Sequence, residues 1–187
     1  MSELFSIQLQ NRQQQGGDGI WLDLPTTTEQ VQAALRQIGI SSDNPQGLFI
    51  SGYFAEEEKR FAIPYNMVLA SNVDELNFLA ARLETLSAGE RAELNAALQA
   101  PQSELSSIGR ITDFPENVDY YVHLPEVHGP AQLGDYYLNR SGMVDMPEEW
   151  KGGIDTAQFG RYVAQQEQGV FTEYGYLVKS GDEWQKV

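Results

Sequence analysis

The stretch GIWLDLPTTTEQVQAALRQIG, residues 19–39, changes from one secondary-structure pattern to another within a few residues. Its first part, GIWLDLP, has the composition of a strand, and Pro25 should stop that strand because proline has no backbone donor. A capping-box pattern, Thr26 to Glu29, follows and predicts a helix over residues 27–38 that ends at Gly39. A strand that passes directly into a capped helix favours an α+β fold.

Two further strands are expected on either side of this stretch. Residues 3–9 alternate apolar and polar side chains, and residues 47–54, GLFISGYF, are rich in strand-forming residues. The glycine-rich GGDG at 16–19 predicts a turn between the first two strands, and the acidic run 56–58 is expected in a loop or at an edge. These elements predict an N-terminal α+β domain, residues 1–63, with an antiparallel sheet and one helix.

From Pro64 the pattern becomes helical. Residues 71–87 place their apolar side chains on one stripe, with Ser71 as the expected N-cap, and a second capping box, Ser87 to Glu90, begins a helix that runs towards Pro101. Two helices in close succession predict a helical hairpin. Such a hairpin has too small a core to be stable alone. We expect a central helical domain, residues 64–110, that docks on a neighbour.

The last third mixes strands and helices. Residues 118–124 are expected to form a strand, and residues 130–142 and 155–169 to form helices, the second closed by its final glycine, with MPEEW as a short helical turn between them. The chain should end in a β-hairpin with Ser180 and Gly181 in the turn. These elements predict a C-terminal α+β domain, residues 111–187.

Charge is the most unusual property of the composition. The chain has 27 acidic and 12 basic residues, a formal net charge of -15, of which the three predicted domains carry -4, -3 and -8. Nucleic acids and anionic membranes would be repelled, so a basic protein is the expected partner. Salt adaptation is disfavoured because Glu (17) outnumbers Asp (10) and apolar content is 41%. Simple solubility remains an alternative explanation.

The sequence offers no sign of secretion or membrane insertion. It contains no cysteine, which excludes disulfides and thiol chemistry. The first fifteen residues lack a basic region and an apolar run of signal length, and no stretch has the roughly 20 apolar residues that a membrane span needs. We expect a cytoplasmic protein.

Patterns typical of enzymes and metal sites are absent or weak. His123 and His128 flank Glu126, but their spacing and Pro125 differ from the His-Glu-x-x-His helix of zinc proteases. No Gly-x-Ser-x-Gly elbow and no phosphate-binding loop is present, and with so many acids a glycosidase-like carboxylate pair has no specificity. We expect a protein that is not an enzyme and needs no cofactor and no metal.

An ordered series of stretches resembles one known family. They are GIWLDLP, DELNFLAARLETLSAGERAELNAAL, ENVDYYVHLPEV, LGDYYLNRSG, IDTAQFGRYV and GVFTEYGYL. In this order, over about residues 4–178, they resemble the ArdA family of antirestriction proteins. The resemblance implies three small domains in an elongated arrangement, and a homodimer formed through the C-terminal domain. It also implies that the protein mimics bent B-form DNA, occupies the DNA-binding groove of type I restriction-modification enzymes and helps mobile DNA to enter a new host.

From this resemblance we hypothesise that carboxylates of the C-terminal domain stand for DNA phosphates. Tyr136, Tyr137, Leu138 and Trp150 would supply the apolar body that fixes them or holds the dimer. The candidate partner-binding residues are Asp113, Glu116, Asp119, Glu126, Asp135, Asp145, Glu148, Glu149, Asp155, Glu167 and Glu173. An acidic interaction module that binds a basic partner unrelated to DNA remains the alternative.

Overall fold

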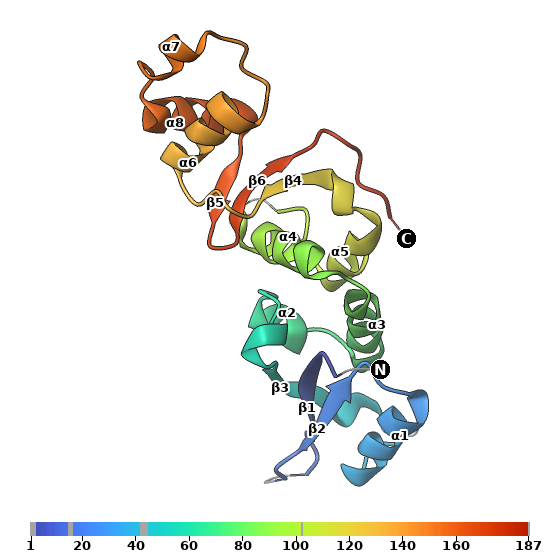
Figure 1. Ribbon diagram of the computed structural model, residues 1–187. Coiled ribbons are helices and arrows are strands. Elements are labelled where there is room, and N and C mark those ends of the chain that lie inside the picture. The colour runs from blue at the N-terminus through green and yellow to red at the C-terminus, as the bar shows by residue number, and fades with distance from the viewer. Residues whose placement is uncertain (1–2, 15–16, 42–44, 102, 187) are drawn as a thin grey trace. The chain divides into compact units, whose positions relative to one another are not determined.

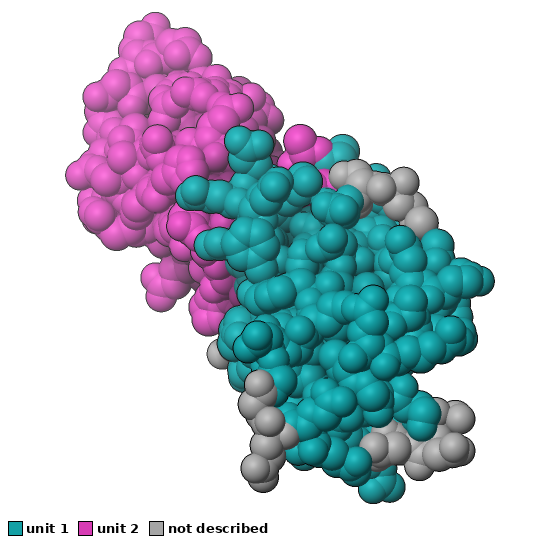
Figure 2. Space-filling view, turned by 90° about the horizontal axis from the view of Figure 1, so that it is seen from below, with its two compact units in different colours: residues 1–87, 105–115 teal, residues 88–104, 116–187 magenta. Residues whose placement is uncertain are grey.

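The computed structural model describes residues 3–14, 17–41, 45–101 and 103–186. It confirms the α+β class: helices combine with two three-stranded antiparallel sheets (Figure 1). The contacts group the chain into two compact units, residues 1–87 with 105–115 (unit 1) and residues 88–104 with 116–187 (unit 2), coloured separately in Figure 2. The division into three domains at residues 63 and 110 stays a prediction. Within the described part of the chain, every helix is too short or too polar to cross a membrane.

The sheet of unit 1 contains the three strands that the sequence predicted. They are β1 (Phe5–Asn11), β2 (Ile20–Leu24) and β3 (Leu48–Phe54), with β1 in the centre and antiparallel to both neighbours. On β1 the odd-numbered residues are buried and the even-numbered ones are less so. One face of the sheet therefore lies on the core and the other faces away from it. Of the predicted GGDG turn, residue 16 lies outside the described residues.

The helix after β2 begins one residue later than predicted. Helix α1 spans Thr28–Gln37, and its capping box pairs Thr27 with Gln30 instead of Thr26 with Glu29. Thr26 has another role, because its backbone N–H donates to Asn77 Oδ1 at 2.7 Å and its carbonyl accepts from Asn77 Nδ2 at 3.0 Å. This contact with a residue 51 positions away holds Thr26 in the loop. Gly39 follows the helix with a positive φ of 69°.

The remaining helices of unit 1 are α2 (Tyr65–Leu69), α3 (Val73–Glu84) and α5 (Ile108–Thr112), with short 3-10 turns at Pro45–Gly47 and Glu57–Lys59. The predicted apolar stripe of α3 is buried. Its N-cap is Asn72, whose side chain accepts from the Glu75 N–H at 2.9 Å, so the prediction of Ser71 was wrong. The Ser71 hydroxyl instead donates to the Met67 carbonyl at 2.8 Å and closes α2.

Unit 2 begins with α4 (Ala88–Gln99), which packs on a second sheet. The strands are β4 (Tyr121–Leu124), β5 (Val170–Thr172) and β6 (Gly175–Lys179), in the order β4-β6-β5. The strand predicted from residue 118 begins at Tyr121, because residues before it form 3-10 turns at Phe114–Glu116 and Val118–Tyr120. The α3 and α4 helices of the predicted hairpin thus belong to different units.

The turn of the C-terminal hairpin was predicted at the wrong place. Thr172 pairs with Gly175, so the turn contains Glu173 and Tyr174, whereas Ser180 and Gly181 follow the last strand. The Thr172 hydroxyl donates to the Gly175 carbonyl at 2.9 Å and accepts from the Tyr174 N–H at 3.1 Å. Gly175 has φ of 122°, a conformation that favours glycine.

Unit 2 also contains a pair of helices, α6 (Pro130–Asp135) and α8 (Thr156–Glu167), which pack against each other and lie side by side in Figure 1. A π-helical turn, Tyr136–Arg140, continues α6, and α7 (Glu148–Lys151) is a single turn. Leu133, Ala164, Val127 and Tyr176 form the core of this region.

Candidate partner-binding surface

Two of the predicted carboxylates are held together by one arginine. Arg140 Nη2 lies 3.2 Å from Asp135 Oδ2, and Arg140 Nη1 lies 3.6 Å from Glu126 Oε2. Asn139 Nδ2 also donates to Asp135 Oδ1 at 2.8 Å. The side chains of Glu126 and Arg140 are mostly exposed, so these ion pairs contribute little to stability, about 0–1 kcal/mol each. Their effect is to orient two carboxylates and leave a net negative charge at the surface.

Glu167 is tied to the fold much more closely than the sequence indicated. The Tyr137 hydroxyl donates to one carboxylate oxygen at 2.5 Å and the Tyr176 hydroxyl donates to the other at 3.0 Å. Burial and the neighbouring Glu167 raise the pKa of both tyrosines well above the ordinary value. An added Cβ at Gly169 would lie 1.9 Å from the Tyr176 hydroxyl, so glycine follows α8 to make room for that ring.

Three other predicted carboxylates have defined partners, two nearby in the sequence and one on α4. Asp155 is the N-cap of α8, where Oδ1 accepts from the Gln158 N–H at 3.0 Å. Glu148 lies 2.6 Å from Lys151 Nζ, and the Glu173 carboxylate accepts a hydrogen bond from Gln99. These contacts limit the side-chain positions of all three residues.

The other five predicted residues lie in turns and short segments. Asp113 caps the C-terminus of α5 in unit 1, and Glu116 and Asp119 lie in the 3-10 turns before β4. Asp145 and Glu149 are exposed in and beside the segment that joins the π-helical turn to α7.

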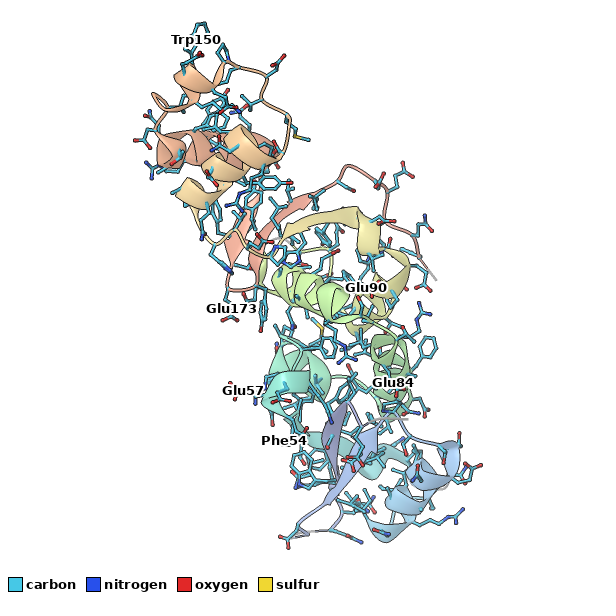
Figure 3. All side chains as sticks on the ribbon, viewed as in Figure 1. Phe54, Glu57, Glu84, Glu90, Trp150 and Glu173 are labelled. Carbon is cyan, nitrogen blue, oxygen red and sulfur yellow. The ribbon has the colours of Figure 1, made fainter. Side chains whose placement is uncertain are left out.

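The structure brings some of these residues together and separates others. Glu126 and Asp135 share Arg140, and Asp145, Glu148 and Glu149 lie within one short exposed stretch. Trp150 in that stretch and Glu173 in the hairpin turn lie at well-separated places on unit 2 (Figure 3). The predicted residues do not converge on a pocket. They form a dispersed set of carboxylates on several elements of unit 2, with Asp113 apart in unit 1.

One carboxyl with unusual properties was missed by the sequence analysis. Glu93 on α4 is half-buried, and burial, followed by the negative charges of Glu90 and Asp119, raises its pKa to about 8. Within the described residues, its buried Oε1 atom has no hydrogen-bond partner. Glu93 is therefore mainly neutral near pH 7. In the sequence, burial of Glu93 is indicated only by its position directly before Leu94 in an alanine-rich helix. The proximity of Asp119 could not be predicted, because it depends on tertiary packing.

Glu93→Gln is expected to stabilise the protein in a pH-dependent way. Between pH 4.5 and about 8 the folded state keeps a proton that the unfolded state loses, so the contribution of Glu93 to stability falls as the pH rises through this range. Because solvent reaches part of the side chain, we expect the variant to gain about 1–2 kcal/mol at pH 8.5 and little at pH 5. Urea unfolding at both pH values measures this, with exposed Glu149→Gln as the control. An equal gain at both pH values would show that Glu93 does not titrate in this way.

The two histidines are explained by local contacts. His123 Nε2 lies 2.8 Å from the Tyr174 carbonyl oxygen, at the end of β4, and His128 is exposed beside Gln132. Across the ranges that the structure describes, no three potential ligands among His, Asp and Glu are placed to hold a metal ion.

The sequence was also compared with known proteins. A family model described as antirestriction protein (ArdA) matches residues 17–178, which is most of the chain. The matched range includes all eleven predicted carboxylates, from Asp113 to Glu173. No curated protein matches the sequence significantly.

Proposed function

The chain belongs to the ArdA family of antirestriction proteins, and from this premise we propose that it inhibits type I restriction-modification enzymes by imitating B-form DNA in their DNA-binding groove. A groove that binds a duplex is lined with cations placed to meet phosphates, and duplex DNA carries one negative charge per about 1.7 Å of its axis. An inhibitor of such a groove needs many anions on a folded scaffold, and no reactive group.

The observation that supports this proposal is the dispersed carboxylate set of unit 2. By sequence, unit 2 has 15 acidic and 6 basic residues, a net charge of -9. Several of its carboxylates are oriented by bonds to the fold, such as Asp155 at the start of α8 and Asp135 beside Arg140. Oriented anions lose less side-chain entropy on binding than freely rotating ones.

Competition with duplex DNA tests the proposal. A labelled duplex that carries the recognition site is bound to a purified type I enzyme, and the protein is titrated in at about 50 and 200 mM salt. We expect the protein to displace the duplex, and its own binding to the enzyme to weaken at least about tenfold at the higher salt, because both ligands use the same cations. Polyglutamate of equal charge is the control and should compete far less.

Two results would argue against mimicry. If the enzyme is inhibited while the duplex stays bound, the protein binds outside the DNA-binding groove. That result would favour the alternative of an acidic interaction module that does not imitate DNA. If binding is equally strong at both salt concentrations, charge does not drive it.

We also propose that the protein forms a homodimer through unit 2. Large apolar side chains are exposed there: Met143 (76%), Trp150 (68%) and Tyr162 (60%). Sedimentation at micromolar concentration should give about twice the chain mass of 20.9 kDa. Trp150→Glu should shift the protein towards the monomer, whereas Phe78→Glu, in unit 1, should leave the dimer intact. A wild-type monomer would contradict the proposal.

A further inference from the structure

The outer face of the sheet in unit 1 carries an exposed tryptophan beside an aspartate. Trp21 and Asp23 are two residues apart on β2, so both side chains project from the face opposite the core residues Leu22 and Leu24. On the neighbouring strand β1, Ser6 is paired with Asp23, and its hydroxyl donates to Asp23 Oδ1 at 2.6 Å. This bond limits the rotation of the Asp23 carboxylate.

The indole of Trp21 extends over the sheet instead of pointing away from it. A Cβ added at Gly52 on β3 would lie 3.0 Å from the Cη2 atom of Trp21 and 3.1 Å from the Cβ of Gln8 on the central strand. The ring therefore reaches from β2 across β1 towards β3, and the absence of a side chain at Gly52 makes room for it. The residue is 49% exposed, so solvent reaches the rest of the ring.

Beside this indole the surface is hollowed. The hollow has a volume of about 360 Å³, and the residues that line it include Glu3, Trp21, Asp23, Pro25, Thr26 and Gln30. None of the lining residues is basic, although arginine and lysine occur elsewhere in unit 1. Two acidic residues and Trp21 thus line one concave site, and among the described residues no basic side chain lines it.

We propose that this hollow binds an arginine side chain presented by a basic segment of another protein. A guanidinium group can stack on an indole and pair with carboxylates through its planar set of donors. A carboxylate accepts up to about four hydrogen bonds, so Asp23, already oriented by Ser6, retains acceptor capacity for this pairing. Lysine fits less well, because its compact ammonium is more strongly hydrated and cannot pair with a carboxylate through two parallel donors.

This inference goes beyond the proposed DNA mimicry. The carboxylates proposed to replace phosphates lie mainly in unit 2, whereas the hollow lies in unit 1 and uses an aromatic face, which the sugar-phosphate backbone of DNA does not offer. The arginine site adds a contact whose chemistry is separate from phosphate imitation. Its partner is a protein surface or segment that exposes arginine.

The test uses the full-length chain labelled with ¹⁵N and three short peptides that differ only in the repeated residue: arginine, lysine or citrulline. We expect the arginine peptide to shift the indole N–H resonance of Trp21 and neighbouring amides, and to bind about fivefold more tightly than the lysine peptide. The citrulline peptide, which is neutral, should not bind measurably.

Variants separate this site from general attraction to an acidic protein. Trp21→Leu and Asp23→Asn should each weaken arginine-peptide binding about fivefold, while the matched changes Phe78→Leu and Asp74→Asn, at exposed positions of α3, should leave it unchanged. Far-UV circular dichroism confirms folding of each variant. Shifts spread evenly over exposed carboxylates of both units, equal binding of the lysine peptide, or unchanged binding to both hollow variants would each overturn the proposal. Because no restriction enzyme is present in this experiment, its outcomes do not test DNA mimicry, which the competition experiment with duplex DNA tests separately.

Discussion

Gly160→Ala is expected to destabilise unit 2 by about 3 kcal/mol or more, because it forces α6 and α8 apart. A Cβ on Gly160 would lie 1.8 Å from the Pro130 carbonyl oxygen and 2.8 Å from the Gly134 backbone nitrogen. These are backbone atoms of the facing helix, so no side-chain rotation can relieve the overlap. A Cβ on Gly134 would likewise lie 1.9 Å from the Thr156 carbonyl oxygen. Both glycines thus permit the close approach of the two helices.

Chemical denaturation followed by circular dichroism measures this effect. Gly89→Ala is the matched control, because Gly89 is also in a helix, but apart from its chain neighbours and the backbone of that helix no described atom lies within 4 Å of the added Cβ. That variant should be as stable as the wild type or more stable by about 0.5–1 kcal/mol, since alanine restricts the unfolded chain. If Gly160→Ala is as stable as the wild type, α6 and α8 are not packed this closely.

Neutralising six carboxylates of unit 2 together is expected to abolish inhibition of a type I enzyme, whereas each single change should have little effect. The six residues are Glu126, Asp135, Asp145, Glu148, Glu149 and Glu173, each changed to its amide. An exposed charge contributes about 0–1 kcal/mol, so one change should weaken inhibition by less than about fivefold. Six changes at roughly 0.5 kcal/mol each give about 3 kcal/mol, or more than a hundredfold.

Asp155 and Glu167 are left out of this variant because they hold the fold together. The control changes six acids of unit 1 that lie outside the predicted set: Asp18, Glu29, Glu56, Glu57, Glu58 and Asp74. It has the same net charge as the first variant and should retain most of the inhibition. Inhibition is read as the concentration of protein that halves DNA cleavage. A single exposed carboxylate whose loss removes inhibition, or equal losses in both six-fold variants, would contradict an array centred on unit 2.

The local spacing of apolar and polar residues was sufficient to predict most of the helices and strands. The strands of unit 1 and the buried stripe of α3 follow from residue spacing, because side chains two apart on a strand, or three and four apart on a helix, share a face whatever the rest of the chain does. Errors at helix starts had two causes. Thr26 failed as an N-cap because the distant Asn77 binds its backbone, whereas Ser71 failed because its hydroxyl binds the carbonyl of Met67, four residues earlier, and closes the preceding helix.

The candidate site shows the same difference between what the sequence determines and what tertiary contacts determine. Composition alone determined that the surface must be strongly acidic, since 27 acids and 12 bases cannot all be buried or paired within one chain of this size. Only tertiary structure decided what each acid does. Glu167 meets Tyr137, 30 residues away, and the half-buried Glu93 lies near Asp119. Charge is a sum over the sequence, but the exposure and partners of a carboxylate depend on which distant elements pack beside it.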